Sequence, residues 1–133
     1  MIIEVTNDLI AKNRQSFQFI RSLVDLPHED VHKYYLSIVS GAKDLTVVAS
    51  CEMSWGDHTP FLSHFHVHPE HRRKGFGTVL LIEAIGVARA WEKWALSLYV
   101  RPQNKAAIGL YRKLGFRVYL ETEPNWLMAR EVQ

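Results

Sequence analysis

Residues 61–81 read FLSHFHVHPEHRRKGFGTVLL and contain the clearest change from strand to helix in the chain. Phe61–His68 is predicted to be a β-strand that Pro69 ends. From Gly75 to Trp94 apolar residues recur at intervals of three and four, which predicts the strongest helix of the chain. The expected apolar stripe of this helix consists of Phe76, Val79, Leu80, Ala84, Val87, Ala88 and Trp91. The chain thus runs from a strand through a basic, glycine-containing loop into a long helix.

The residues before this stretch predict a strand, helical segments and a hairpin. In order, these are a strand at Ile2–Val5, a helix carrying Leu9, Ile10, Phe17, Ile20 and Val24 that Pro27 stops, a helical turn at His28–Lys33, and paired strands at Tyr34–Ser40 and Leu45–Trp55. Gly41 to Asp44 separates the paired strands, as expected for a hairpin loop.

After the long helix, the pattern predicts a short strand at Ala95–Val100, an amphipathic helix at Asn104–Leu114 and two final strands at Arg117–Glu121 and Asn125–Glu131. Gly115 follows the last apolar turn of the second helix, where a left-handed C-terminal cap is expected. The order is roughly β-α-(α)-β-β-β-α-β-α-β-β. This order predicts a mixed α/β domain in which helices cover a sheet.

Composition limits the class of protein. The chain has 133 residues, of which 47% are hydrophobic and 23% charged, so we expect a single globular domain spanning residues 1–133. Cys51 is the only cysteine, which excludes an internal disulfide. No apolar run is long enough for a membrane helix, and the cytoplasm is the expected compartment. A net charge of +2 is too mild to indicate a nucleic-acid partner.

The loop between the central strand and the long helix is the strongest chemical signal. Gly75 and Gly77 let the backbone pass close to a ligand. The first amides of the helix are unpaired and carry partial positive charge, and Arg72, Arg73 and Lys74 precede them. These features predict an anion site, most plausibly for a diphosphate. The alternative is a glycine-rich helix start with a solvated basic cap. Neither a Walker loop nor a Rossmann fingerprint is present.

Two segments resemble the GNAT superfamily of N-acetyltransferases. Arg72-x-x-Gly75-x-Gly77 matches the superfamily's acyl-CoA signature [QR]-x-x-G-x-[GA]. The later segment from Asn104 to Phe116 resembles its N-x-x-A-x-x-L-Y-x-x-x-G-F pattern. The two segments lie in the expected order on the expected elements, and the resemblance covers about residues 34–131. It implies a central mixed, mostly antiparallel sheet flanked by helices.

The resemblance also implies acetyl-CoA as cosubstrate and assigns residues to it. The pantetheine arm would lie along the strand before the loop, and the pyrophosphate on the loop and helix start. The implied cofactor-binding residues are Phe65, His66, Val67, Arg72, Arg73, Lys74, Gly75, Phe76, Gly77, Thr78 and Asn104. Tyr111 matches the tyrosine that protonates the leaving thiolate, and a phenol has an unperturbed pKa near ~10. Core packing is the alternative for Tyr111, while Asn104 can also cap its helix.

The general base is not assigned by the sequence. Close relatives that acetylate protein N-termini carry Glu where this chain has Tyr99. Glu52, His64, His66, Tyr99 or a water wire remain candidates. His64, His66 and His68 alternate along the predicted strand, so they would project from one face. A zinc-dependent hydrolase built on these three histidines is one rival hypothesis, although no metal is expected in the acetyltransferase interpretation.

The resulting interpretation is an acetyl-CoA-dependent N-acetyltransferase that moves an acetyl group directly to a primary amine. The acceptor is a small molecule or a protein, and the two are equally compatible with the sequence. A second rival is a non-catalytic acyl-CoA-binding module, which would keep Gly75, Gly77 and Asn104 without a working base. Superfamily members are often dimers, so the resemblance leaves a homodimer open.

Overall fold

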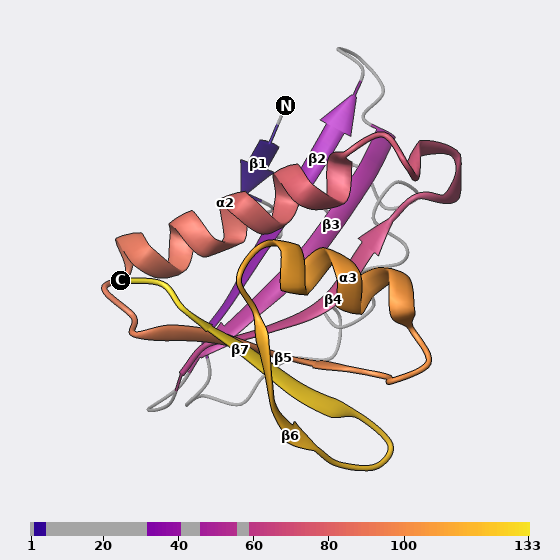
Figure 1. Cartoon of the computed structure of the whole chain (residues 1–133). Coiled ribbons are helices and arrows are strands. Elements are labelled where there is room, and N and C mark those ends of the chain that lie inside the picture. Colours follow the sequence, from indigo (N-terminus) through magenta and orange to yellow (C-terminus); the bar gives the residue numbers. More distant parts are fainter. Residues whose placement is uncertain (1, 5–31, 41–45, 56–58) are drawn as a thin grey trace.

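The computed structural model describes residues 2–4, 32–40, 46–55 and 59–133. Their strands form one seven-stranded sheet in the order β1-β2-β3-β4-β5-β7-β6 (Figure 1). The strands are β1 (Ile2–Glu4), β2 (His32–Ser40), β3 (Thr46–Trp55), β4 (Phe61–Val67), β5 (Ala95–Val100), β6 (Arg117–Glu121) and β7 (Trp126–Glu131). Only β4 and β5 pair in parallel, and each other neighbouring pair is antiparallel. The expected mixed, mostly antiparallel sheet is confirmed.

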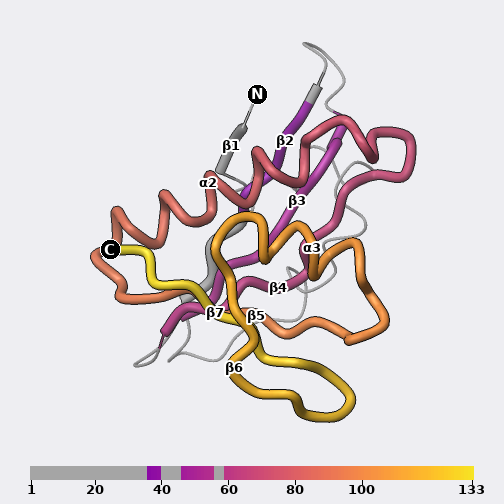
Figure 2. Tube along the Cα trace, in the orientation of Figure 1, coloured from indigo at the N-terminus to yellow at the C-terminus, as the bar shows by residue number. Residues whose placement is uncertain are grey.

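Two helices, α2 (Phe76–Ala90) and α3 (Lys105–Lys113), cover the same face of this sheet (Figures 1 and 2). A short 3-10 helix, η2 (Pro69–His71), stands between β4 and α2. The core between sheet and helices includes Leu36, Cys51, Met53, Leu62, Leu80, Leu81, Ala84, Leu96, Leu98, Ile108, Tyr111, Phe116 and Met128. Among the described residues, no helix has the length and apolar character needed to span a membrane.

Some element boundaries differ from the sequence prediction. β2 begins at His32, so the helical turn predicted over His28–Lys33 is wrong for its last two residues. The N-terminal helix and the rest of that turn lie outside the described residues. α2 ends at Ala90, not at Trp94, because Glu92 has a left-handed φ of 59°. Trp91 caps this end, and its ring packs against Trp55 with 3.9 Å between centroids.

The buried face of α2 is also shifted from the predicted stripe. Leu80, Leu81, Ala84, Ile85 and Ala88 are buried, whereas Val79 is 45% exposed. Ile82 is apolar as well and lies on the exposed side. Because α2 carries apolar residues on both sides, periodicity alone could not identify the side that faces the sheet.

The end of α3 has the cap that the sequence predicted. Gly115 is left-handed, with a φ of 92°. Its amide donates to Arg112 O at 3.1 Å, and the Phe116 amide donates to Tyr111 O at 3.0 Å. This pair of bonds is a Schellman motif. It satisfies the last carbonyls of α3 and leads the chain into the buried ring of Phe116.

Replacing Gly115 with Ala is expected to lower the free energy of unfolding by about 1–2 kcal/mol or more, because the left-handed conformation is costly with a Cβ. A Cβ there would also lie 2.8 Å from Arg130 Nε. Gly109→Ala is the matched control, since that position in α3 is open. It should raise stability by about 0.5–1 kcal/mol. Urea unfolding monitored by tryptophan fluorescence measures both, and equal effects of the two variants would contradict the cap.

Candidate active site

The site begins where β4 and β5 separate. The two parallel strands pair at Phe61 with Ser97 and at Leu62 with Leu98. β4 then continues to Val67 and β5 to Val100 without further pairing between them. Among the described residues, no strand pairs with this edge of β4 beyond Leu62, and α3 follows β5 across the opening (Figure 1). Free strand edges carry unpaired amides and carbonyls that can bind an extended ligand.

A cleft of about 630 Å³ lies between β4, the start of α2 and the first half of α3. Its lining residues are Phe65, His66, Val67, His71, Arg72, Arg73, Gly75, Phe76, Gly77, Thr78, Asn104, Ala106, Ala107 and Leu110. The structure thus brings together all the predicted cofactor-binding residues except Lys74, which does not line the cleft. The sequence reasoning missed His71, Ala106, Ala107 and Leu110. Ala107 and Leu110 follow Asn104 at steps of three, a helical spacing that was available in the sequence.

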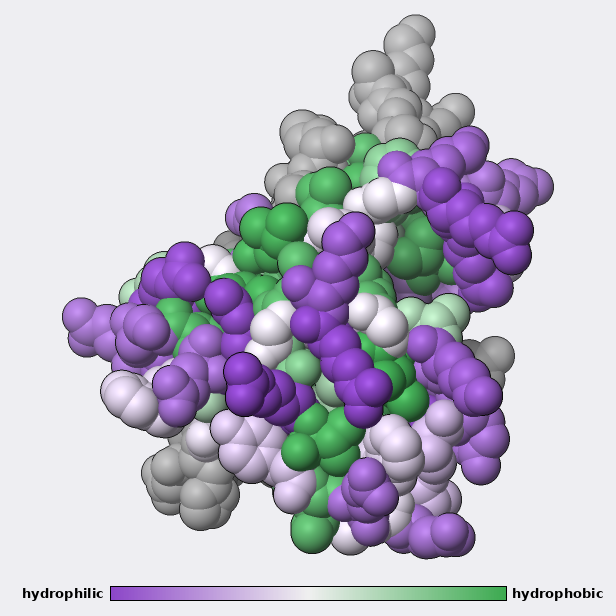
Figure 3. Space-filling model, viewed as in Figure 1, coloured by the Kyte–Doolittle hydropathy of each residue, from purple (hydrophilic) through white to green (hydrophobic). Residues whose placement is uncertain are grey.

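The connection from β4 to α2 presents its amides to this cleft. Arg73 and Gly75 both have left-handed backbones, with φ values of 63° and 86°. Val79 N donates the first helical hydrogen bond of α2 to Gly75 O at 3.1 Å. The amides of residues 76–78 come before that bond, so helix geometry leaves them without intrahelical partners. Hydrophilic side chains gather over this connection at the upper right of Figure 3. Amides and cations together make a site for an anion.

Arg72 fixes the loop to the strand that precedes it. Its Nε donates to Val67 O at 3.0 Å. The nearby guanidinium also acts on His66, whose pKa is lowered first by partial burial and then by the charges of Arg72 and His68. A lowered pKa keeps the His66 imidazole neutral at pH 7. Arg72 therefore has a structural role in addition to adding positive charge to the cleft.

Close packing at Gly77 brings the three elements of the cleft together. A Cβ at Gly77 would lie 3.3 Å from Leu110 Cδ2 and 3.6 Å from Val67 Cγ2. The start of α2 thus approaches both α3 and β4 as closely as a glycine allows. On α3, Asn104 Oδ1 accepts from Ala107 N at 3.3 Å, which confirms the predicted helix cap.

Tyr111 lies in the core behind the cleft wall and does not line the cleft itself. Its side chain is buried, and its ring meets the Phe65 ring edge-on at a centroid distance of 6.0 Å. Burial, with a smaller contribution from Cys51, raises the pKa of Tyr111 to about 12. The phenol is therefore protonated throughout the neutral range. Tyr111 therefore packs in the core, as its alternative assignment predicted, and it contacts the cleft lining through Phe65.

Stability should fall as pH rises above about 9, where thiols and then phenols ionise in an unfolded chain. Burial raises the pKa of Cys51 to about 12, and that of Tyr111 is also about 12. The unfolded chain therefore loses these protons first. Each group should cost about 1.4 kcal/mol per pH unit between its unfolded and folded pKa values. Urea unfolding between pH 8 and pH 11 measures this slope, and Cys51→Ala should make it shallower. An identical slope in that variant would contradict the buried neutral thiol.

A second cluster lies on the sheet face opposite α2 and α3. Glu52 on β3 is 3% exposed, and its Oε2 lies 3.0 Å from Nδ1 of His64 on β4. Cross-strand pairing runs from Glu52–Ser63 to Ser50–His66, so His64 and Phe65 together oppose Cys51. This bulge gives His64 a φ of 51° and turns its ring toward Glu52. From the sequence, Glu52 and His64 were separate candidates for the general base. Their contact could not be predicted, because a bulge leaves no reliable signal in the alternation of polar and apolar residues.

The bulge also changes the expected row of histidines. His64 is bonded to Glu52, and His68 lies past the end of β4, where its Nδ1 accepts from Glu70 N at 3.3 Å. Within the described residues, the group of metal-ligating side chains that comes together is His68, Glu70 and His71, with ligand atoms within 4.8 Å of one another. His64 belongs to a different group of contacts. His64, His66 and His68 therefore do not come together as one set of metal ligands, which is what the zinc-hydrolase rival required.

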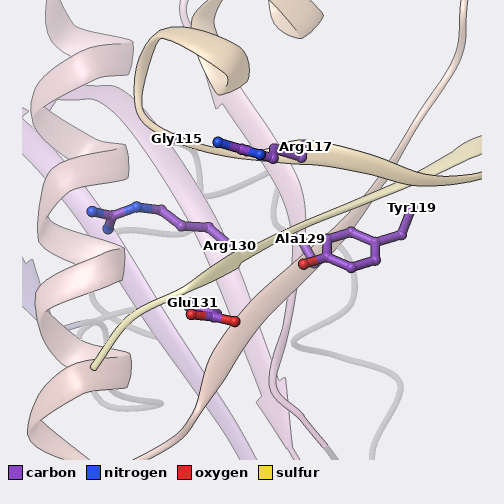
Figure 4. A pocket seen from close by; sticks show the side chains of 6 residues that line it. All are labelled: Gly115, Arg117, Tyr119, Ala129, Arg130 and Glu131. Carbon is purple, nitrogen blue, oxygen red and sulfur yellow. The ribbon is translucent and has the colours of Figure 1, made fainter.

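Another cavity, of about 330 Å³, lies by the end of α3 and the strands β6 and β7. Gly115, Arg117, Tyr119, Ala129, Arg130 and Glu131 line it (Figure 4). None of the predicted cofactor-binding residues belongs to this lining. Its cations stand next to the C-terminal end of α3, where positive charge is favourable in any helix.

Comparison with known proteins identifies the family. The profile of the acetyltransferase (GNAT) family matches residues 5–116. An acetyltransferase of Yersinia pestis is 34% identical over 89 residues, which are 65% of this chain and 59% of that protein. The chain thus spans about three-fifths of that relative's length. The chain belongs to the GNAT acetyltransferase family.

Solved structures confirm the fold. The ribosomal-protein-S18-alanine N-acetyltransferase of Escherichia coli superposes with a TM-score of 0.74, at 21% identity over 100% of this chain and 94% of that one. The PaiA N-acetyltransferase of Thermoplasma acidophilum, solved in complex with coenzyme A, gives 0.65 at 22% identity over 96% of this chain and 80% of that one. The fold seen here is thus one that holds coenzyme A in another protein.

Proposed function

We propose that the protein transfers an acetyl group from acetyl-CoA directly to a primary amine of a small molecule or a protein, within a ternary complex. The observation that carries this proposal is the cleft along β4, which combines a free strand edge with the amides and cations at the start of α2. A ligand with an extended amide-containing arm and a terminal pyrophosphate matches both features. Acetyl-CoA is such a ligand.

In this proposal the pyrophosphate binds the amides of residues 76–78, next to Arg72 and Arg73. The arm follows β4 from Val67 toward Phe65 and passes between that strand and the α3 residues Asn104 and Leu110, which line the opposite wall. The thioester then lies where β4 and β5 separate. Lys74 is exposed beside the loop and contributes long-range positive charge without lining the cleft.

The reaction forms one C–N bond and breaks one C–S bond. The neutral amine attacks the thioester carbonyl carbon, and the resulting tetrahedral intermediate expels the thiolate of CoA. Tyr111 gives its phenolic proton to the sulfur and regains a proton from the nitrogen that has become acylated. The products are the acetamide and CoA thiol. A group whose pKa is about 12 carries its proton in every ground state at pH 7, which this role requires.

We assign deprotonation of the acceptor ammonium to the pair of Glu52 and His64. His64 Nδ1 lies 3.0 Å from Glu52 Oε2. In this proposal the other ring nitrogen, Nε2, therefore accepts the proton from the ammonium group of the acceptor substrate. The His64 side chain is 56% exposed, whereas that of Glu52 is 4% exposed. The carboxylate thus orients the imidazole, as in other acid–histidine pairs. Water carries the released proton away.

Tyr111→Phe is expected to lower kcat about 10²- to 10⁴-fold, the usual contribution of a positioned acid. Binding of acetyl-CoA and CoA, measured by isothermal titration, should be unchanged, and ATP should not bind. Turnover is followed by thiol release with a panel of amines. Tyr119→Phe is the matched control, because Tyr119 is 64% exposed on β6.

Three results would contradict this part of the proposal. Absence of acetyl-CoA binding would remove the cleft assignment. Binding without thiol release by any amine would favour the non-catalytic acyl-CoA-binding module. Equal turnover by the Tyr111 and Tyr119 variants would leave Tyr111 with a packing role only.

Glu52→Gln should keep the shape of the site and remove the negative charge behind His64. We expect kcat to fall at least about 10-fold, because the amide is a weaker acceptor than the carboxylate and holds the imidazole less firmly. His64→Ala should lower kcat further, and the double variant should be no worse than His64→Ala alone. His68→Ala is the control. Additive losses in the double variant would show that the two residues act separately.

A further inference from the structure

The sheet face that carries Glu52 and His64 also carries an aromatic pair. Phe61 and Tyr99 stack with their ring centroids 5.4 Å apart and their planes 13° from parallel. Leu62 and Leu98, which follow Phe61 and precede Tyr99, are buried in the core under the helices. Alternation along a strand therefore places both rings on the opposite face, the one to which Glu52 belongs.

This aromatic pair borders the separation of β4 and β5. Leu62 and Leu98 form the last paired position. Ser63 is the next residue on β4 and Tyr99 the next on β5, so in parallel strands they stand at the same level. His64 follows Ser63 directly. Tyr99 and His64 therefore flank the opening in which the proposed acetyl group lies, one from each strand.

The ring of Tyr99 is accessible to a ligand. Its side chain is 58% exposed, although the ring is apolar and lies against Phe61. Exposed aromatic rings with a flat packed backing are typical of binding surfaces, because they bury large area at low entropic cost. A cation or another ring can add to the free side of such a stack.

The described strands around this opening offer few acidic groups to a ligand. Strands β3, β4 and β5 contain one acidic residue, Glu52, and it is already bonded to His64. A polyamine or an aminoglycoside carries several ammonium groups, and each needs its own anionic or carbonyl partner. One carboxylate next to an aromatic stack fits a ligand with one amino group and one flat apolar group.

We propose that the acceptor is a small aromatic monoamine, with its amino group at His64 and its ring against the stacked Phe61 and Tyr99. This inference rests on the proposed acetyltransferase function and specifies the acceptor for the same site. It requires that the amino group and the ring be joined by a short aliphatic link, since His64 and Tyr99 flank one opening.

The test compares three probes: 2-phenylethylamine, butylamine and spermidine. We expect kcat/KM for 2-phenylethylamine to exceed that for either of the others at least about 10-fold, the value of one aromatic contact. Tyr99→Ala should lower kcat/KM for 2-phenylethylamine about 10-fold more than it lowers kcat/KM for butylamine, while Tyr99→Phe should retain the preference. Tyr119→Ala, which removes a tyrosine of similar exposure from β6, should have no effect.

The outcomes separate this inference from the acetyltransferase function. Faster turnover of spermidine or equal turnover of butylamine would overturn the aromatic monoamine while leaving acetyl transfer intact. An equal change in kcat/KM for all three amines in Tyr99→Ala would also overturn the aromatic monoamine and leave acetyl transfer intact. If no amine is acetylated, titration of 2-phenylethylamine into the CoA-saturated protein still tests whether the acceptor site exists. Binding that Tyr99→Ala weakens would support the acceptor site, and absence of binding would overturn it.

Discussion

The short pairing of β4 with β5 shapes both the sheet and the cleft. Two paired positions join two otherwise antiparallel halves into one sheet, and past them the strands diverge. Longer pairing would close the edge of β4 and leave no room for an extended ligand. The crossover through α2 holds the strands parallel, because such connections place a helix over one face of the sheet.

The separation of these strands divides the chemistry between the two faces of the sheet. On the helical face, the cleft combines a free strand edge, helix amides and arginines, all suited to an anionic cosubstrate. On the other face, Glu52 and His64 stand beside the aromatic pair of Phe61 and Tyr99. The bulge at His64 connects the two, since it turns this one residue toward Glu52 while Phe65 packs against Tyr111.

Much of this arrangement was predictable from particular residues. The glycine loop before α2 indicated an anion site, and ten of the eleven predicted cofactor-binding residues line one cleft. Gly115 indicated the cap of α3 because few other residues adopt its backbone conformation. Val79 was predicted to lie in the buried stripe of α2 but is exposed. The pattern was ambiguous because α2 has apolar residues on its exposed side as well. The start of β2 was also missed, because local propensity at His32 and Lys33 yields to pairing with β3.

Local sequence patterns were enough to predict the order of the described elements, the basic glycine-containing loop and the candidate side chains of the site. These follow from local rules, namely periodicity, capping and glycine geometry, which act within a few residues. The pairing of Glu52 with His64, the position of Lys74 outside the cleft and the stacking of Tyr99 on Phe61 became visible only in the folded chain. Each of these depends on strand register, on a bulge or on how far two strands stay together. Such features arise from contacts between residues distant in sequence, for which local patterns carry no signal.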